Sequence, residues 1–187
     1  MKKNVAERGY TLIELLIVTG IFVIVSGVVL ANNARFGGMI TLENFAYDVA
    51  LSIRQAQVYS IAVQRVGSND YGSAYGMHFD IGSSATYELF ADTVTVNGLY
   101  DPGELLQVTN MNGGYRVSSL CVRASGAATE TCGLSRLDVT FKRPEPDAYI
   151  RSDGVTTLHE AGRVVVISPR GETADIVIES TGQISIQ

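Results

Sequence analysis

The hydrophobic and polar positions of this chain follow three successive patterns. The first is an apolar run over residues 15–34 that contains no charge and no proline. A helix of that length spans about 30 Å, the thickness of the hydrocarbon core of a bilayer. Lys2, Lys3 and Arg8 precede the run, and basic residues favour the cytoplasmic side of a membrane. We therefore predict one membrane-spanning helix with its N-terminus inside the cell.

The second pattern is that of an amphipathic helix. It follows two glycines at positions 37 and 38, which predict a hinge where the chain leaves the bilayer. Apolar residues then recur every three or four positions, which predicts a helix that ends near Gln64 or Arg65. This apolar stripe consists of Leu42, Phe45, Ala46, Val49, Ile53 and Ala56. Such a stripe needs a sheet to cover it.

The third pattern, from residue 75 onward, is an alternation with a period of two, which is typical of strands. The eight predicted strands are 75–81, 87–90, 105–109, 115–122, 137–142, 163–168, 175–179 and 183–187. Short strands joined by glycine-rich turns favour antiparallel sheets. We expect an α+β fold in which a long N-terminal helix packs on antiparallel β-sheets of about eight short strands.

Glu14 does not fit a passive membrane anchor, because it lies between Leu12-Ile13 and Leu15-Leu16. A carboxylate at the centre of a bilayer costs about 2.5–3.5 kcal/mol on insertion scales, and less near an interface. Two interpretations remain open. Either the side chain extends to the lipid headgroups, or its charge has a fixed partner within the membrane.

The residues around Glu14 carry a family resemblance. Gly9-Tyr10-Thr11-Leu12-Ile13-Glu14-Leu15-Leu16, after a short basic leader, resembles the class III signal of type IV pilins and type II secretion pseudopilins. The resemblance implies that prepilin peptidase cleaves between Gly9 and Tyr10 and that the new N-terminus at Tyr10 is methylated. It also implies that Glu14 pairs with the N-terminal amine of a neighbouring subunit. Tyr10 stands where the family usually has Phe.

The order of one long helix and then short strands is most similar to the H-type minor pseudopilin (GspH/FimT) family. The resemblance implies a structural subunit of a type II secretion pseudopilus or type IV pilus. The implied segments are a cleaved leader (1–9), a transmembrane and filament-core helix (10–38), an amphipathic helix (39–66) and a β-rich domain (67–187). The implied partners are prepilin peptidase, other pilins or pseudopilins, and an assembly platform and ATPase at the inner membrane. The β-rich domain is expected outside the cytoplasm.

Two alternative functions remain. Val29-Leu30-Ala31 has small residues suited to ordinary signal peptidase, so the chain is alternatively a secreted β-rich binding domain that begins at Asn32. The second alternative is a DNA-uptake minor pilin. The formal net charge of −5 and the absence of Lys and Arg from residues 180–187 argue against nucleic acid as a partner.

The two cysteines are too few for a disulfide framework or a four-thiolate zinc site. Cys121 and Cys132 are separated by ten residues, in a part of the chain that is expected to lie outside the cytoplasm. Disulfides persist in such compartments. We predict a disulfide between them, and two free thiols are the alternative.

An acidic loop and two histidines are the remaining candidates for chemistry. The spacing of Asn97, Asp101 and Glu104 resembles part of an EF-hand calcium loop, and Asp92, one residue out of register, is a further candidate ligand. An acidic hairpin loop with an Asp-Pro-Gly turn is the favoured alternative. Calcium is the one cofactor considered. The sequence has no recognisable catalytic motif, which predicts a protein that is not an enzyme. His78 is expected on the solvent face of a strand and His159 in a loop.

Overall fold

The computed structural model describes residues 10–62 and 73–187, with the side chains of residues 31–37 left aside. The chain has two compact units, Met1–Met39 and Ile40–Gln187. One long helix, α1 (Leu12–Ile61), contributes its first part to the first unit and its second part to the second unit. The leader 1–9, with Gly9, and the predicted helix end near residues 64–66 lie outside the described residues.

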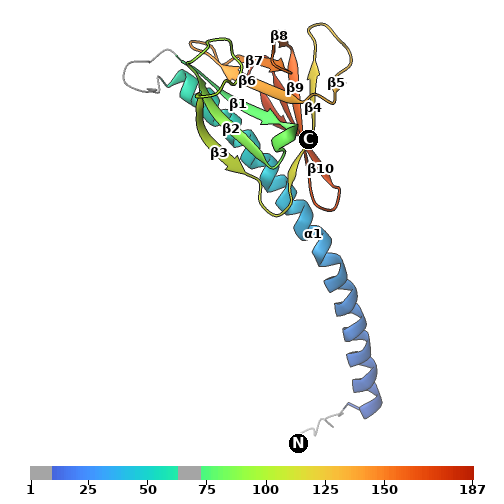
Figure 1. Cartoon of the computed structure of the whole chain (residues 1–187). Helices are drawn as coiled ribbons and strands as arrows, with labels where there is room; N and C mark the ends of the chain where they lie inside the picture. Colours follow the sequence, from blue (N-terminus) through green and yellow to red (C-terminus); the bar gives the residue numbers. More distant parts are fainter. Residues whose placement is uncertain (1–9, 63–72) are drawn as a thin grey trace, which may run out of the picture. The chain divides into compact units, whose positions relative to one another are not determined.

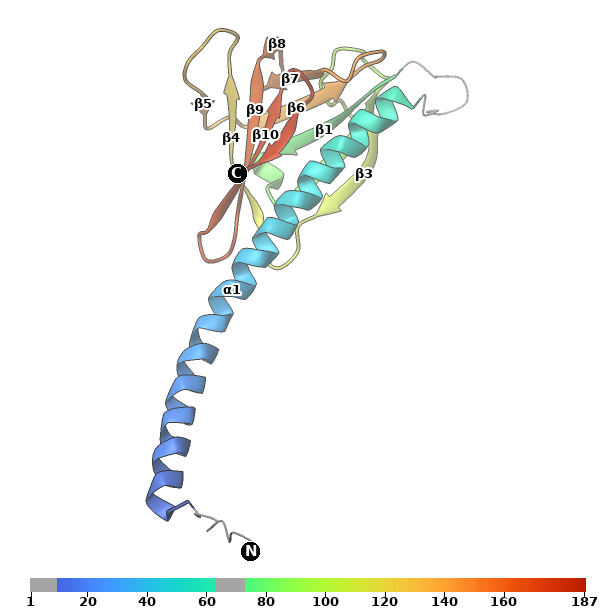
Figure 2. The same ribbon diagram turned by 180° about the vertical axis from the view of Figure 1, so that it is seen from behind.

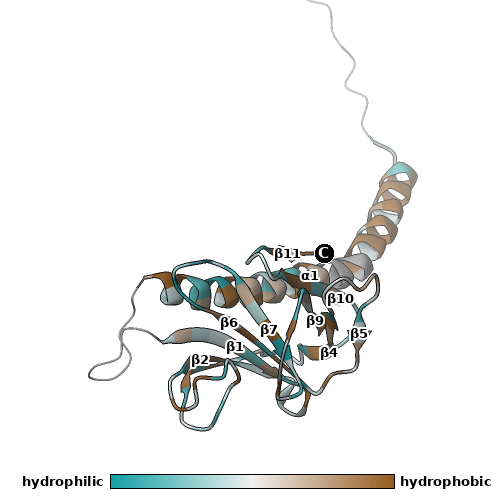
Figure 3. Ribbon diagram, turned by 90° about the horizontal axis from the view of Figure 1, so that it is seen from above, coloured by the Kyte–Doolittle hydropathy of each residue, from teal (hydrophilic) through white to brown (hydrophobic). Residues whose placement is uncertain are grey.

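The first unit consists, in its described part, of the N-terminal portion of α1. The segment Leu12–Leu30 is long and apolar enough to cross a membrane, and its hydrophobic colouring is visible in Figure 3. Every large apolar side chain of this segment is exposed. Helix α1 continues through Gly37 and Gly38, so the predicted hinge is not a break in the helix. The boundary between the compact units lies just after these glycines, between Met39 and Ile40.

The second unit packs the remainder of α1 against two antiparallel sheets (Figures 1 and 2). One sheet has six strands in the order β3-β2-β1-β6-β7-β8, and the other has five in the order β11-β10-β9-β4-β5. A short 3₁₀ helix, η1 (Ile81–Ser83), follows β1. The strands are β1 (Ala74–Asp80), β2 (Thr86–Asp92), β3 (Leu105–Asn110), β4 (Arg116–Arg123), β5 (Thr131–Cys132), β6 (Arg136–Phe141), β7 (Ala148–Ser152), β8 (Val155–His159), β9 (Ala161–Ile167), β10 (Thr173–Glu179) and β11 (Ile184–Ile186).

The hydrophobic core of the second unit contains residues of the helix and of both sheets. The predicted stripe on α1 faces this core, since five of its six residues are buried and Phe45 packs against the core with its ring 4.6 Å from that of Tyr115. The largest fully buried side chains include Tyr75, Phe79 and Phe141 from the six-stranded sheet. The α+β prediction is therefore confirmed, and residues 10–62 and 73–187 contain eleven strands in place of about eight.

The three strands that were not predicted are β5, β7 and β8. Strands β7 and β8 form a hairpin around Asp153-Gly154, and both of these residues have positive φ, of 50° and 71°. This dipeptide is a strong signal for a two-residue hairpin turn. Strand β5 has only two residues, which is too short for an alternating pattern to be recognised.

We expect Ile53→Ala to lower the free energy of unfolding by about 2–5 kcal/mol, because its fully buried side chain would leave a cavity between α1 and the sheets. The matched control is Leu51→Ala on the same helix, where the side chain is 66% exposed and the expected change is within about 0.5 kcal/mol. Urea unfolding followed by tyrosine fluorescence measures both, since the chain has nine Tyr and no Trp. Equal effects of the two substitutions would contradict this helix orientation.

Candidate functional site

The first turn of α1 holds a reciprocal pair of side chains. The helix begins at Leu12, so Thr11 is the N-cap residue and Glu14 occupies the third helical position. Oε2 of Glu14 accepts hydrogen bonds from the backbone N–H of Thr11 at 2.9 Å and from its hydroxyl at 2.8 Å. The backbone N–H of Glu14 donates to the same hydroxyl at 3.3 Å. This arrangement is a capping box, and it places the carboxylate at the positive end of the helix dipole.

Both contacts of the Glu14 carboxylate go to a single oxygen atom. Oε2 accepts both hydrogen bonds, and no contact to Oε1 is found among the described residues. Tyr10, which precedes the cap, is 85% exposed. The helix start therefore presents one occupied and one open carboxylate oxygen beside the chain position where the mature N-terminus is expected.

The exposed apolar surface after Glu14 continues without interruption to Leu30. A surface of that extent is not stable in water and requires lipid or other apolar helices around it. Within it, the hydroxyl of Thr19 donates to the backbone carbonyls of Leu15 and Leu16, at 2.9 and 3.0 Å. The polar hydrogen of that hydroxyl is therefore satisfied without water, as an apolar environment demands.

Comparison with known families identifies this segment. The model of the prokaryotic N-terminal methylation motif matches residues 5–30. Residues 5–30 are a type IV pilin signal. No curated protein and no solved structure was found to match the chain.

The pilin signal supports a type IV pilin-like subunit that is processed as a prepilin. It implies processing by prepilin peptidase and assembly with other pilins. The apolar helix is consistent with a single-pass membrane anchor. Assignment to the H-type subfamily stays a prediction.

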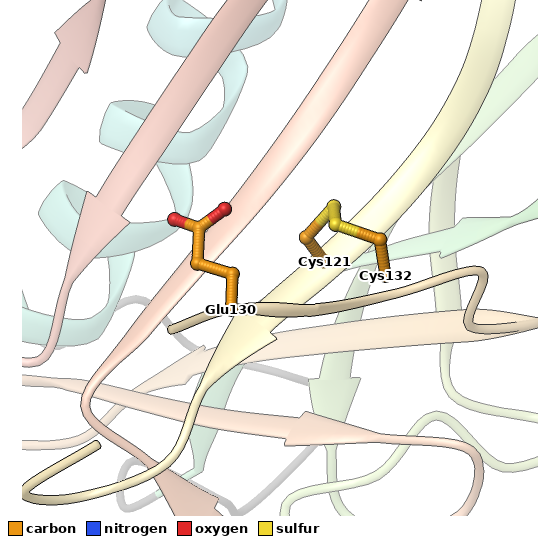
Figure 4. Close-up of side chains that lie close together, drawn as sticks. All are labelled: Cys121, Glu130 and Cys132. Atoms are coloured by element: carbon orange, nitrogen blue, oxygen red, sulfur yellow. A yellow bond between two sulfur atoms is a disulfide. The ribbon is translucent and has the colours of Figure 1, made fainter. Parts of the chain in front are cut away.

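The two cysteines are joined in a disulfide, as predicted. Cys121 on β4 and Cys132 on β5 are direct partners in the antiparallel register of these strands. Glu130 lies beside the two sulfur atoms (Figure 4), and its ligand oxygen and the sulfurs are within 4.8 Å of one another. Because both sulfurs are in the disulfide, they are not thiolate ligands. Arg163 donates to Glu130 at 2.8 Å, and its Nη2 lies 3.5 Å from one sulfur and 3.6 Å from the other.

The acidic loop between β2 and β3 is folded around its own carboxylates. Oε1 of Glu104, a buried side chain, accepts from the backbone N–H groups of Thr93 and Val94 at 2.9 Å each, and its Oε2 accepts from that of Asp101 at 3.0 Å. Oδ1 of Asp92 accepts from the backbone N–H of Asn97 at 3.2 Å, and Oδ2 accepts from that of Gly98 at 2.9 Å.

The four predicted calcium ligands therefore have partners within the loop. The side-chain amide of Asn97 donates to Asp101 at 3.0 Å, and its carbonyl oxygen accepts from the N–H of Leu99 at 2.7 Å. Among the described residues, the acidic side chains of this loop do not form a group of three ligand atoms within 4.8 Å of one another. The calcium site stays a prediction, and the geometry favours the alternative of a self-supporting acidic loop.

The prediction that His78 faces solvent is wrong. His78 is buried, its Nδ1 lies 2.7 Å from Oδ1 of the fully buried Asp138, and its ring is 4.7 Å from that of Tyr100. The loop between β2 and β3 covers this face of the sheet, which the alternating pattern does not reveal. His159 ends β8 and is not in a loop. Its Nε2 lies 3.1 Å from the hydroxyl of Ser152, and burial lowers the pKa of its imidazole.

We expect Glu104→Gln to lower the free energy of unfolding by about 1–3 kcal/mol, because one carboxylate oxygen becomes an amide donor that faces backbone N–H groups. The control is Glu145→Gln at an exposed position, with an expected change within about 0.5 kcal/mol. Thermal unfolding of the wild type with and without millimolar calcium is measured in parallel, and we expect no shift. A calcium-dependent increase in the midpoint that Glu104→Gln removes would instead establish the metal site.

Proposed function

We propose that this protein is a minor pseudopilin-like structural subunit of a type II secretion pseudopilus or a type IV pilus. The observation that carries the proposal is the carboxylate of Glu14 in the first turn of α1, directly before the charge-free residues 15–34 and within a pilin signal. The arrangement of one long helix followed by two antiparallel sheets supports the assignment to the H-type subfamily.

The open oxygen of Glu14 provides the chemical basis for assembly. Cleavage after Gly9 would create a positively charged amine at Tyr10, and opposite charges attract strongly where water is excluded. Because the capping box occupies only Oε2, Oε1 can accept a hydrogen bond from the amine of a neighbouring subunit without loss of the cap. Such a pair would fix the axial register between adjacent helices in a filament.

Two further features support an orientation with the N-terminus in the cytoplasm. Lys2, Lys3 and Arg8 lie on the N-terminal side of the apolar segment. The disulfide between Cys121 and Cys132 belongs to an oxidising compartment, such as that outside the inner membrane. We infer that the β-rich domain lies outside the cytoplasm, while a platform protein and an ATPase at the inner membrane drive assembly.

We also propose that the chain is not an enzyme and does not bind DNA. The His78–Asp138 pair lies beneath Tyr100, and the His78 side chain is only 9% exposed, so a substrate has little access to it. Arg163, a cation near the C-terminal strands, is paired with Glu130 and Asp175. Residues 180–187 carry no basic side chain that would contact a phosphate backbone.

The mature N-terminus decides between prepilin processing and an ordinary secretory signal. We expect intact-protein mass spectrometry of the chain purified from membranes to give a polypeptide that begins at a methylated Tyr10. A chain that begins at Asn32 would instead identify a secreted β-rich binding domain and overturn the proposal. An uncleaved chain in a strain without prepilin peptidase is the control for the assignment of the cut.

The role of Glu14 is tested by Glu14→Gln, which preserves the shape of the side chain and removes its charge. We expect processing at Tyr10 to remain and incorporation into sheared filaments to fall by at least about tenfold, because the amine of the neighbour loses its ionic partner. The control is Ser26→Ala, which removes a polar atom from the same segment. Normal incorporation of Glu14→Gln would refute the pairing, whatever the mature N-terminus is.

A further inference from the structure

The outer face of the six-stranded sheet, opposite to α1, carries a cavity of about 240 Å³. We call it the Arg151 pocket. Its walls come from β1, β2, β6, β7 and the loop between β2 and β3, and it lies wholly within the second unit. The lining is both polar and apolar, with Val96 and Tyr149 as apolar surfaces and Asn97 and Thr140 as polar ones.

Arg151 has a charge without an ionic partner in contact. Its Nη1 donates to the hydroxyl of Thr140 at 3.2 Å and lies 3.5 Å from the carbonyl oxygen of Gly98, while its buried Nε has no hydrogen-bond partner. No carboxylate oxygen of the described residues is within 4.0 Å of this guanidinium. Burial lowers the pKa of Arg151, since the charged form is incompletely compensated.

The other arginines that are half-buried on strands differ in this respect. Arg123 contacts Glu160 and Glu179, Arg136 contacts Asp138, and Arg163 contacts Glu130 and Asp175, all within 4.0 Å. Partial burial of a guanidinium in this fold is thus normally accompanied by an ion pair, as the cost of desolvation requires. Arg151 is the exception among these four arginines, because it has no ion pair.

Asp92, which also lines the pocket, does not supply the missing contact. Both of its oxygens already accept backbone N–H groups, from Asn97 and Gly98. Lys142, an exposed residue directly after β6, adds a second cation to the lining, and it has no ion pair among the described residues. Two cations against one engaged carboxylate leave an excess of one positive charge.

We propose that the Arg151 pocket binds a single carboxylate group, held between the guanidinium of Arg151 and the ammonium of Lys142. A single carboxylate balances the excess charge of one, whereas a dianion such as phosphate exceeds it. The apolar wall of Val96 and Tyr149 suits a short aliphatic remainder attached to the carboxylate. The carboxylate comes either from a small free acid or from an acidic side chain of a second copy of this chain. This proposal is independent of the role of Glu14.

Ligand binding is tested with butyrate as the probe and with butyramide as its neutral isostere. The mature full-length chain is kept in a polyoxyethylene detergent, and binding is followed by saturation-transfer NMR. We expect butyrate to bind at least about tenfold more tightly than butyramide and to be weakened by added salt. Butyrate that binds no better than butyramide would overturn the proposal.

Three substitutions locate the site. Arg151→Met should abolish butyrate binding, and Lys142→Met, at an exposed position that does not threaten folding, should weaken it several-fold. The matched control is Arg116→Met, which removes the same charge from an exposed position on β4 of the other sheet and should leave binding unchanged. If Arg151→Met fails to fold, Lys142→Met still decides. Equal effects of Lys142→Met and Arg116→Met would show a general charge effect and refute the site.

Sedimentation equilibrium distinguishes the two sources of the carboxylate. If the source is a second copy, Arg151→Met and added butyrate both reduce self-association of the chain relative to Arg116→Met and to butyramide. If the source is a free acid, self-association is unaffected while butyrate binding persists. Both results support the pocket, and they differ only in the natural occupant.

Discussion

A carboxylate at the start of an apolar helix must be satisfied in every environment that the chain passes through. In the isolated subunit, Thr11 donates a backbone N–H and a hydroxyl to it, so the Glu14 carboxylate is hydrogen-bonded even before assembly. The cap also fixes where α1 begins, because the N–H of Glu14 returns a bond to the same hydroxyl. Glu14, the residue that is costly to place in a bilayer, thus also organises the first turn of the helix.

This geometry explains how one side chain can serve both a local and an intermolecular role. Because the cap uses only Oε2, a neighbouring amine can reach Oε1 without competing with the capping hydrogen bonds. The pairing then costs the desolvation of the ammonium group and of the remaining exposed carboxylate oxygen, while the first turn stays intact. The exposed apolar surface from Leu12 to Leu30 then supplies the non-directional part of the association.

The sequence predicts those features whose cause is local. The pilin signal, the apolar stripe from Leu42 to Ala56 and the alternating strands are each encoded in residues that are close together, and so is the disulfide between Cys121 and Cys132. The capping box was equally visible as Thr11-x-x-Glu14, and Asp153-Gly154 marked the β7–β8 hairpin. Neither the cap nor this hairpin is among the predicted features. The helix continues through Gly37 and Gly38, because each glycine costs only about 1 kcal/mol of helix propensity. A pair of glycines by itself therefore does not predict where a long helix is interrupted.

The burial of His78 could not be predicted from the sequence for a different reason. An alternating pattern predicts which residues lie on the two faces of a strand. It does not predict whether a loop from another part of the chain covers the polar face. Here β1 is buried on both faces, since Phe90 and Tyr100 cover the side of the sheet that faces away from α1. Gly76 makes this possible, because a Cβ there would lie 2.6 Å from the ring of Phe90 and 2.7 Å from Thr140.

The acidic loop that forms this cover uses oxygen atoms in the way that a calcium loop does, but with backbone N–H groups in place of the cation. Glu104 and Asp92 each collect several donors, which closes the loop and holds Gly98 against the guanidinium of Arg151, where a Cβ would come within 2.2 Å of Nη1. The consequence is an asymmetry of charge. The carboxylate of Asp92 accepts hydrogen bonds from the backbone of the loop itself. Among the described residues, the guanidinium of Arg151 beneath the loop has no carboxylate in contact. The same packing that engages the carboxylates of the loop therefore creates the Arg151 pocket, which we propose an external carboxylate completes.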